Sequence, residues 1–244
     1  MRWWQRPVWS LDLETTGADP LTAQIVEWAL VRVAPTRHVL EVSGGVVDVA
    51  VPDAAAAVHG ITSDVTRWGM TPTFALVRIL EGLSQVRDCG EPLVVFNAAY
   101  DLTVVHSLAR LGGDSLRGLR VIDPLVIDRH CDRYRKGRRR LEDVCRQYGV
   151  QGAGWHSASG DALAAARLAF AIAEEHHELH GLSLDELHEA QVVWAREWAE
   201  GLQNFKRRNG EPTAVVDGSW PVRGVRERQG GPGARAEVGE VGRL

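Results

Sequence analysis

The chain has 244 residues, which is enough for one domain of ordinary size with an appended segment. Hydrophobic residues make up 45% and charged residues 25% of it, the balance of a globular protein in water. No apolar run approaches the roughly 18 residues needed to span a bilayer. The formal net charge of −4 excludes binding to nucleic acid through overall charge, so such binding would need local basic patches or bound metal ions.

The N-terminus and the cysteines add two expectations. The first residues lack the long apolar stretch and cleavage site of a signal peptide, so we expect a cytoplasmic protein with no membrane partner. Cys89, Cys131 and Cys145 are odd in number and widely spaced, which argues against a disulfide framework or a zinc site.

The first fifth of the chain predicts three strands. Residues 7–13 form a short apolar run rich in β-favouring residues, which indicates a buried central strand. Residues 24–34 and 38–49 are rich in valine and partly alternate between apolar and polar residues. Together the three segments predict an antiparallel meander.

Helices and short strands alternate after the meander. Residues 73–86 carry apolar residues at helical spacing after Pro72, and proline is favoured where a helix begins. Two more strands and four more helices are predicted at 93–96 and 119–122, and at 101–111, 124–131, 140–148 and 160–178. This order predicts an α/β fold with a mixed five-stranded sheet flanked by helices.

The chain divides into three predicted regions: a domain over residues 1–180, a helical extension over 181–223 and a disordered tail over 224–244. The tail is rich in Gly, Pro, Arg and Glu without periodicity, which is typical of disorder. Within the extension, residues 183–208 approximate one apolar helical stripe, formed by Leu184, Leu187, Val192, Trp194, Trp198, Leu202 and Phe205. We expect the stripe to pack on the domain; the alternative is contact with a polymerase or a second copy.

Two acidic residues end the first predicted strand. Asp12 and Glu14 are two residues apart, so their carboxylates lie on the same face of the strand. Neighbouring buried carboxylates are costly unless a positive charge neutralises them, and oxygen-only ligands favour Mg²⁺ or Mn²⁺ over zinc. A single pair of this kind is common by chance. Here it interrupts an apolar strand and precedes the turn Thr15-Thr16-Gly17, so we take it as a candidate metal site.

Asp101, His156 and Asp161 are further candidates, and each also has an ordinary explanation. Asp101 follows the fourth predicted strand at the start of a helix, and Asp161 falls in the first turn of another. Acidic residues are common at both places because the helix dipole favours them. His156 lies in a turn containing Ser and Gly, where a surface histidine is unremarkable.

Four motifs occur in order over residues 7–178: 11–17 (LDLETTG), 58–62 (VHGIT), 96–101 (FNAAYD) and 156–162 (HSASGDA). Together they resemble the DEDDh (DnaQ-like) family of 3′→5′ exonucleases, which includes the proofreading ε subunit of bacterial DNA polymerase III. The segments RYRKG near residue 134 and AVVDGSWP from residue 214 also resemble stand-alone exonuclease-domain proteins of high-GC Gram-positive bacteria and their phages. One departure is Tyr100, which stands where Phe is common in the family.

The resemblance implies a ribonuclease-H-like fold and a set of functional residues. It assigns four carboxylates as ligands of two Mg²⁺ or Mn²⁺ ions, Asp12, Glu14, Asp101 and Asp161, with His156 as the general base. It also implies that the turn containing Thr15 and Thr16 holds the terminal 3′-hydroxyl. His59, Ile61 and Asn97 complete the expected substrate contacts, the first two against the last bases; the alternative for 59–62 is a loop that enters a helix capped by Thr62.

A basic run lies between the third and fourth motifs. Six cations crowd residues 132–141: Arg133, Arg135, Lys136, Arg138, Arg139 and Arg140. We predict that Arg135, Lys136 and Arg138 contact backbone phosphates, and the alternative is a solvated surface loop.

Three functions remain open from the sequence. The favoured one is a 3′→5′ exonuclease that removes nucleotides from single-stranded DNA ends during proofreading, repair or degradation. An RNA exonuclease would use the same catalytic residues and differ in its tolerance of a 2′-hydroxyl near Thr15 and Thr16. A non-catalytic polymerase-docking or nucleic-acid-binding module is disfavoured, because no member of the catalytic set is missing.

Overall fold

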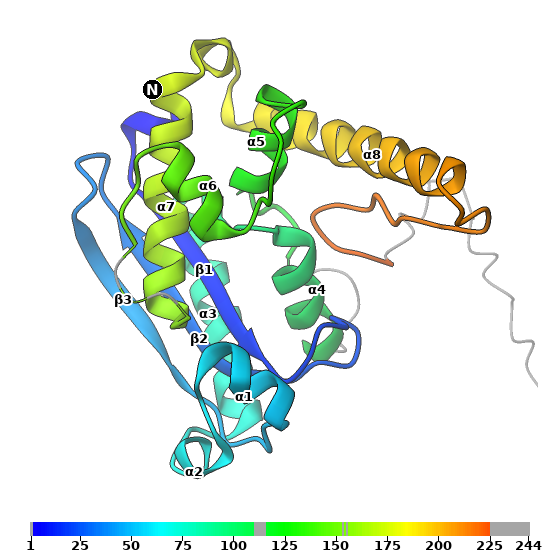
Figure 1. Cartoon of the computed structure of the whole chain (residues 1–244). Coiled ribbons are helices and arrows are strands. Elements are labelled where there is room, and N and C mark those ends of the chain that lie inside the picture. The colour runs from blue at the N-terminus through cyan, green and yellow to red at the C-terminus, as the bar shows by residue number, and fades with distance from the viewer. Residues whose placement is uncertain (1, 110–115, 153, 155, 225–244) are drawn as a thin grey trace, which may run out of the picture.

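A five-stranded mixed sheet forms the centre of the computed structural model, which describes residues 2–109, 116–152, 154 and 156–224 (Figure 1). The strand order is β3-β2-β1-β4-β5. β1 pairs antiparallel with β2 and parallel with β4, β3 pairs antiparallel with β2, and β5 pairs parallel with β4. The bounds are β1 (Val8–Thr15), β2 (Ile25–Val33), β3 (Val39–Val46), β4 (Leu93–Val94) and β5 (Val121–Ile122). The predicted meander and mixed sheet are confirmed.

Helices cover both faces of the sheet and give two apolar cores. α3 (Pro72–Cys89) and α4 (Ala98–Ala109) pack in the core that contains Trp9, Leu11 and Leu13 of β1. The opposite core contains Val8 together with α5 (Pro124–Cys131), α6 (Leu141–Gln147) and α7 (Ala158–Glu175). Figure 1 shows α6 and α7 in front of the sheet and α3 behind it.

The alternation of β1 decides which side chains face α7. Because Trp9, Leu11 and Leu13 point toward α3 and α4, the alternate residues Asp12 and Glu14 face the opposite side, on which α7 packs. The apolar character of both faces explains why β1 lies at the centre of the sheet. The same strand therefore supplies both core packing and two carboxylates.

Short elements account for most differences from the predicted ones. The sequence prediction missed α1 (Asp53–His59), because DAAAAVH has no clear polar and apolar faces. α2 (Ser63–Thr66) begins after Thr62, as the alternative for residues 59–62 expected, although the Thr62 side chain makes no capping hydrogen bond. Two 3-10 helices, Trp3–Gln5 and His177–Gly181, complete the described elements.

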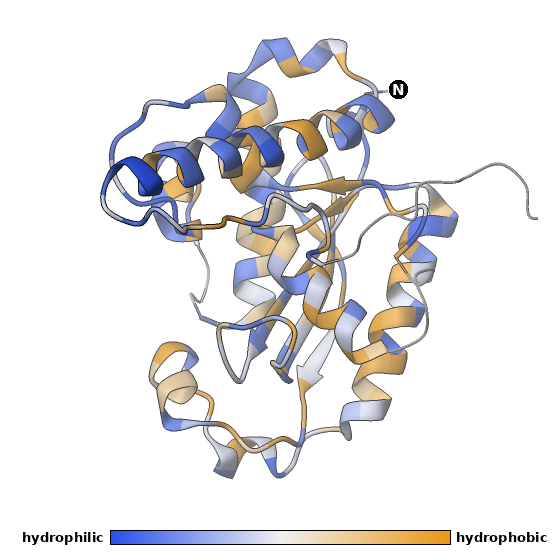
Figure 2. Cartoon of the chain, turned by 90° about the vertical axis from the view of Figure 1, so that its right-hand side faces the viewer, coloured by the Kyte–Doolittle hydropathy of each residue, from blue (hydrophilic) through white to orange (hydrophobic). Residues whose placement is uncertain are grey.

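The C-terminal extension packs on the domain through part of its stripe. α8 (Leu184–Arg208) contacts α5 and β5, and it buries Leu187 and Ala199. Trp198 and Phe205 farther along the helix remain 38% and 58% exposed. Figure 2 shows hydrophilic and hydrophobic residues mixed along α8 and the following segment running beside it. A partner for the exposed end of α8 stays a prediction.

The segment after α8 returns to the sheet. Trp220 is 6% exposed within the core that contains β1, and its indole N–H donates to Asp123. The predicted boundary near residue 180 stays a prediction, and the predicted tail lies outside the described residues from 225 onward. Within the described part of the chain, no helix is long and apolar enough to cross a membrane.

Candidate active site

Three carboxylates gather where β1 ends. One oxygen each from Asp12, Glu14 and Asp161 lies within 4.8 Å of the other two. Asp161 reaches the group from the first turn of α7, whose start is capped by Ser157, since its hydroxyl accepts the N–H of Gly160 at 3.2 Å. Residues that are about 150 positions apart in the sequence thus meet because α7 packs on β1.

Asp101 approaches Asp12 from α4, on the other side of β1. It is 5% exposed, and its Oδ1 accepts the N–H of Leu13 at 3.1 Å. α4 begins at Ala98 because the Asp123 carboxylate accepts the N–H groups of Asn97 and Ala98, each at 2.9 Å. Asp101 therefore lies in the first helical turn, near the three-carboxylate group but outside its 4.8 Å limit.

The group holds more negative charge than its surroundings neutralise. Burial and then the charges of Asp101, Asp161 and Glu14 raise the pKa of Asp12 well above its usual value. Burial also raises the pKa of Glu14 to about 7 and that of Asp161 to about 6. In addition, Oδ1 of Asp161 is buried and has no hydrogen-bond partner among the described residues. A divalent cation with oxygen ligands fits these features.

Glu27 is a fifth carboxylate at this edge, and the sequence prediction missed it. It lies on β2 directly opposite Glu14, and its Oε2 accepts the N–H of Ala158 at 2.8 Å. Its charge contributes to the raised pKa values of Asp12 and Glu14. The predicted meander was the only available signal, because the register that pairs Glu27 with Glu14 does not follow from either strand alone.

His156 lies beside Asp161 on the segment that leads into α7. Its backbone has a φ of 66°, and its side chain is 55% exposed with Nε2 3.4 Å from Oε1 of Glu142. The backbone N–H and ring of His156 oppose the rise in the pKa of Asp161. The structure thus brings His156 to the carboxylate group and adds Glu142, whose position in α6 gave no sequence signal.

The turn after β1 is held from two sides. Oγ1 of Thr15 lies 2.5 Å from the phenolic oxygen of Tyr100, which also donates to the carbonyl oxygen of Gly17. Thr16 exchanges two hydrogen bonds with Gln24: its N–H donates to the Gln24 carbonyl at 3.0 Å, and its hydroxyl oxygen accepts the Gln24 N–H at 2.9 Å. The turn is therefore fixed next to Glu14 by both α4 and Gln24, the residue that precedes β2.

His59 and Ile61 are largely shielded from solvent. His59 is 7% exposed at the end of α1, and its Nδ1 accepts the N–H of Ile61 at 3.1 Å. Ile61 is partly buried against the core. Burial lowers the pKa of His59, and a hydrogen bond to the backbone of Thr15 opposes this shift. Contact of either residue with substrate stays a prediction.

The basic run contains two kinds of arginine. Arg135 and Arg139 are 14% and 13% exposed, and both bind the fully buried carboxylate of Asp128 at 2.6 Å. Because a buried carboxylate needs a charged partner, Asp128 engages the Arg135 guanidinium, and the predicted contact of Arg135 with phosphate stays a prediction. Lys136 and Arg138 are exposed, and their predicted phosphate contacts stay predictions.

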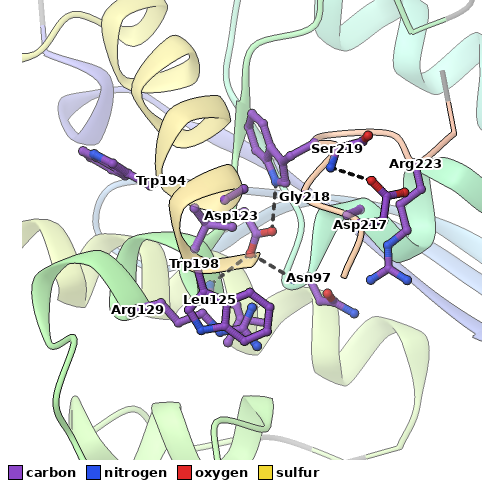
Figure 3. Close-up of a pocket in the computed structure, with 14 residues that line it drawn as sticks. Asn97, Asp123, Leu125, Arg129, Trp194, Trp198, Asp217, Gly218, Ser219 and Arg223 are labelled. Carbon is purple, nitrogen blue, oxygen red and sulfur yellow. Dashed lines mark hydrogen bonds between the residues drawn. The ribbon is translucent and has the colours of Figure 1, made fainter. Parts of the chain in front are cut away.

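Asn97 lines a pocket that the candidate catalytic carboxylates do not line. The pocket has an empty volume of about 450 Å³, including its solvent-open part, and lies between α4, α5, α8 and residues 217–223 (Figure 3). Arg129 stacks on Trp198 at its wall, with the guanidinium carbon 3.6 Å from the ring centroid. Asp12, Glu14, Asp101, His156 and Asp161 do not line this pocket.

A second group of possible metal ligands is satisfied by its own hydrogen bonds. Cys131, His176 and Glu178 offer atoms within 4.8 Å of one another. Both ring nitrogens of His176 are engaged at 3.0 Å, one by Tyr148 and the other by Glu178. Burial raises the pKa of Cys131 to about 12, so the thiol is protonated at neutral pH. Among the described residues, the β1 group contains a buried ligand oxygen without a hydrogen-bond partner, whereas both ring nitrogens of His176 are engaged.

Comparisons with known proteins found similar solved structures. A search of curated proteins found no match. Among solved structures, E. coli exonuclease I is 20% identical with a TM-score of 0.59, covering 72% of this chain and 42% of its own. Exonuclease I from Methylocaldum szegediense is 22% identical with a TM-score of 0.57, covering 82% and 46%. These likenesses show a shared fold, and this chain spans less than half the length of either relative.

The family comparison covers both the strand that carries Asp12 and the helix turn that carries Asp161. The model described as "RNase_T: Exonuclease" matches residues 9–169, which is most of the described domain before α8. Asp101 and His156 lie within the match as well. The chain belongs to this exonuclease family.

Proposed function

We propose that the chain is a metal-dependent 3′→5′ exonuclease acting on single-stranded DNA. The observation that carries the proposal is the group Asp12, Glu14 and Asp161, whose oxygens converge with one of them unpartnered. Membership of the exonuclease family supports the reaction. Solved structures of E. coli exonuclease I in complex with dT13 and dA16 oligonucleotides favour DNA as the substrate class.

Asp12, Glu14 and Asp161 would hold a divalent cation, and Asp101 beside Asp12 would help to hold a second. The all-oxygen donor set favours Mg²⁺ or Mn²⁺, although one E. coli exonuclease I complex is described as a zinc-bound form. When bound, such ions neutralise the carboxylates and stabilise negative charge on the phosphate during hydrolysis. The raised pKa values of these carboxylates support this assignment, because the site without a cation resists ionisation.

His156 would act as the general base that removes a proton from the attacking water. Its exposed imidazole lies beside Asp161, and an imidazole nitrogen can accept a proton from water. Glu142, with Oε1 3.4 Å from Nε2, would orient the ring and stabilise the imidazolium that results. Thr15 and Thr16 at the end of β1 would hold the terminal sugar, and Lys136 and Arg138 would bind backbone phosphates.

The test is digestion of single-stranded DNA and RNA of matched sequence, each labelled at its 5′ end. With Mg²⁺ or Mn²⁺, we expect a ladder that shortens from the 3′ end, with DNA degraded faster than RNA. The Asp12→Asn variant keeps the volume of the side chain and should produce no ladder. Failure to shorten either strand would contradict the exonuclease proposal, and faster RNA degradation would overturn the choice of DNA.

A further inference from the structure

Two arginines from distant parts of the chain line the pocket between α4, α5, α8 and residues 217–223 (Figure 3). Arg129 comes from α5, and Arg223 comes from the returning C-terminal segment. Much of the remaining wall is apolar or aromatic, and it includes Trp194, Trp198 and Trp220. The empty volume of about 450 Å³, solvent-open part included, is in the size range of sites for small ligands.

The guanidinium of Arg129 has lost water without gaining a carboxylate partner. It stacks on the ring of Trp198, which leaves the N–H groups in its plane to other acceptors. Among the described residues, no carboxylate forms an ion pair with it and no acceptor takes one of its N–H groups. Burial, and to a smaller degree the charges of Arg139 and Arg223, lower its pKa to about 10. This wall of the pocket therefore offers unused donors to an anion.

The carboxylates near Arg129 are engaged elsewhere. Asp128 is shared by two arginines of the following loop. Asp123 accepts three backbone N–H groups and one indole N–H. Asp217, which also lines the pocket, accepts a backbone N–H at 2.8 Å and forms no ion pair with another described residue. An anion for Arg129 would therefore have to come from a ligand.

The pocket lies on the same edge of the sheet as the candidate active site. β1, β4 and β5 are parallel neighbours, so their carboxyl ends meet at one edge. Glu14 lies at the end of β1, whereas Asn97 after β4 and Asp123 after β5 line the pocket. β5 is two strand spacings from β1, about 10 Å, and a stacked single strand advances about 3.4 Å per nucleotide. The pocket is thus about three nucleotides from the carboxylates.

We propose that this pocket binds an internal phosphodiester of the single-stranded substrate, about three nucleotides from its 3′ end, through Arg129, with Arg223 as a second cation. A phosphodiester accepts the in-plane N–H groups of a guanidinium, and the indole rings offer its base an apolar surface. The inference rests on the proposed exonuclease function, which places the 3′ end at β1. Because the family model matches residues 9–169, the indole and guanidinium groups beyond it belong to the extension of this chain.

The first test compares a thymidine dodecanucleotide with the dinucleotide, which is too short to reach the pocket. Arg129→Gln should raise KM for the dodecanucleotide about ten-fold with kcat nearly unchanged, and it should leave KM for the dinucleotide unchanged. Arg223→Gln should act in the same direction, by about three-fold. Asp217→Asn removes a negative charge from the pocket but keeps an acceptor, so it should lower KM for the dodecanucleotide about two-fold. Initial rates of release of the first nucleotide measure these effects.

The second test measures binding without cleavage. Fluorescence anisotropy of the labelled dodecanucleotide in EDTA should show a Kd about ten-fold higher for Arg129→Gln. The slope of log Kd against log salt concentration should fall by about 0.7, the value for one phosphate contact in a single strand. Arg78→Gln is the matched control, because this guanidinium pairs with Glu81 on the exposed face of α3. It should change neither Kd nor the slope.

The two tests separate this inference from the proposed function. If the wild type releases no nucleotide, the proposed function fails, and binding in EDTA still decides whether the pocket holds the strand. If the wild type is active and Arg129→Gln keeps its KM for the dodecanucleotide, or raises KM equally for the dinucleotide, only the inference is overturned. Should Arg129→Gln fail to fold in a melting experiment, the opposite effects expected for Arg223→Gln and Asp217→Asn decide in its place.

Discussion

The charge state of Asp12, Glu14 and Asp161 links the site to the stability of the protein. Their folded pKa values are raised, to about 7 for Glu14 and about 6 for Asp161. A raised carboxyl pKa means that the folded protein holds protons that the unfolded chain releases. The stability that protonation provides is therefore complete below the unfolded pKa values near 4 and is lost as the pH rises through the folded ones.

Without metal, the melting temperature of the wild-type chain should fall from about pH 5 to about pH 8. The melting temperature of the Asp12→Asn variant should fall less over this pH range, because one of the repelling charges is gone. Mn²⁺ should raise the wild-type melting temperature more at the higher pH, where the carboxylates are ionised and free to bind. Thermal unfolding with EDTA or Mn²⁺ measures this. Equal pH slopes for the two proteins would contradict the assigned electrostatics.

His156, which we propose as the general base, gives a second prediction, about proton transfer. His156→Ala should lower kcat about 10²- to 10⁴-fold, the range that general-base catalysis supplies. Its effect on Mn²⁺ binding should be small, because the carboxylates are unchanged. Steady-state kinetics and the melting shift on adding Mn²⁺ measure the two effects separately. A variant with wild-type kcat would remove His156 from the role of general base.

At the scale of elements, the segment after α5 depends on a buried ion pair. Asp128 is fully buried in α5 and accepts hydrogen bonds from Arg135 and Arg139, which lie on the following loop. The guanidinium of Arg139 also donates to the backbone carbonyl oxygens of Asp128 and Asp132. These contacts fix the path of the loop. The exposed side chains of Lys136 and Arg138 therefore extend from a backbone that is anchored to α5.

Replacing the buried carboxylate of Asp128 should lower the free energy of unfolding far more than replacing a carboxylate in an exposed ion pair. Asp128→Ala leaves two guanidinium groups without their carboxylate, and we expect it to lower the free energy of unfolding by about 3–5 kcal/mol. Asp143→Ala breaks an exposed pair with Arg146 and should cost less than about 1 kcal/mol. Urea unfolding at one pH compares them. Similar losses for the two variants would refute the structural role assigned to Asp128.

Helices and strands could be predicted from the sequence where their apolar residues recur at a regular spacing. The meander, α3, α7 and α8 were predicted within a few residues, because their apolar residues recur at strand or helix spacing. The start of α4 was predicted three residues late, since its first N–H groups are capped by Asp123, which lies 25 residues farther along the chain. A cap supplied by tertiary contact leaves no signal in the neighbouring sequence.

Some residues of the candidate site could likewise be predicted from the sequence, and others could not. The spacing of Asp12 and Glu14 places them on one strand face, whereas Asp161 was assigned only by the family resemblance, because an acidic residue in a first helical turn is common. Glu27 and Glu142 reach the site only through strand register and packing, which no local pattern encodes. Charge spacing likewise could not separate Arg135 from Arg138, because burial beside Asp128 distinguishes them.

At the scale of the whole molecule, the C-terminal extension is joined to the site through Asp123. This buried carboxylate accepts the N–H groups of Asn97, Ala98, Leu125 and Trp220. Three of these bonds fix the starts of α4 and α5, and the fourth holds the returning C-terminal segment. Gln191 of α8 also accepts the N–H of Asp123. The extension thus supports the helix that carries Asp101.

Trp220→Ala should therefore affect the whole fold. It empties a buried site and removes one donor from Asp123, so we expect a loss of about 3–5 kcal/mol in the free energy of unfolding, within a single transition. Val215→Ala changes a side chain in the same segment that is 79% exposed, and it should stay within about 0.5 kcal/mol. Two separate unfolding transitions in the wild type would show that the extension is independent of the domain.

We propose that the carboxylates at the end of β1 form a metal-dependent nuclease site. The most direct measurement is the initial rate of nucleotide release from single-stranded DNA as a function of Mn²⁺ concentration, for the wild type and Asp12→Asn. We predict no release in EDTA, a saturable rise with Mn²⁺ for the wild type, and a rate lower by about 10³-fold or more in the variant. Release that is independent of metal, or equal in the two proteins, would contradict this assignment of the site.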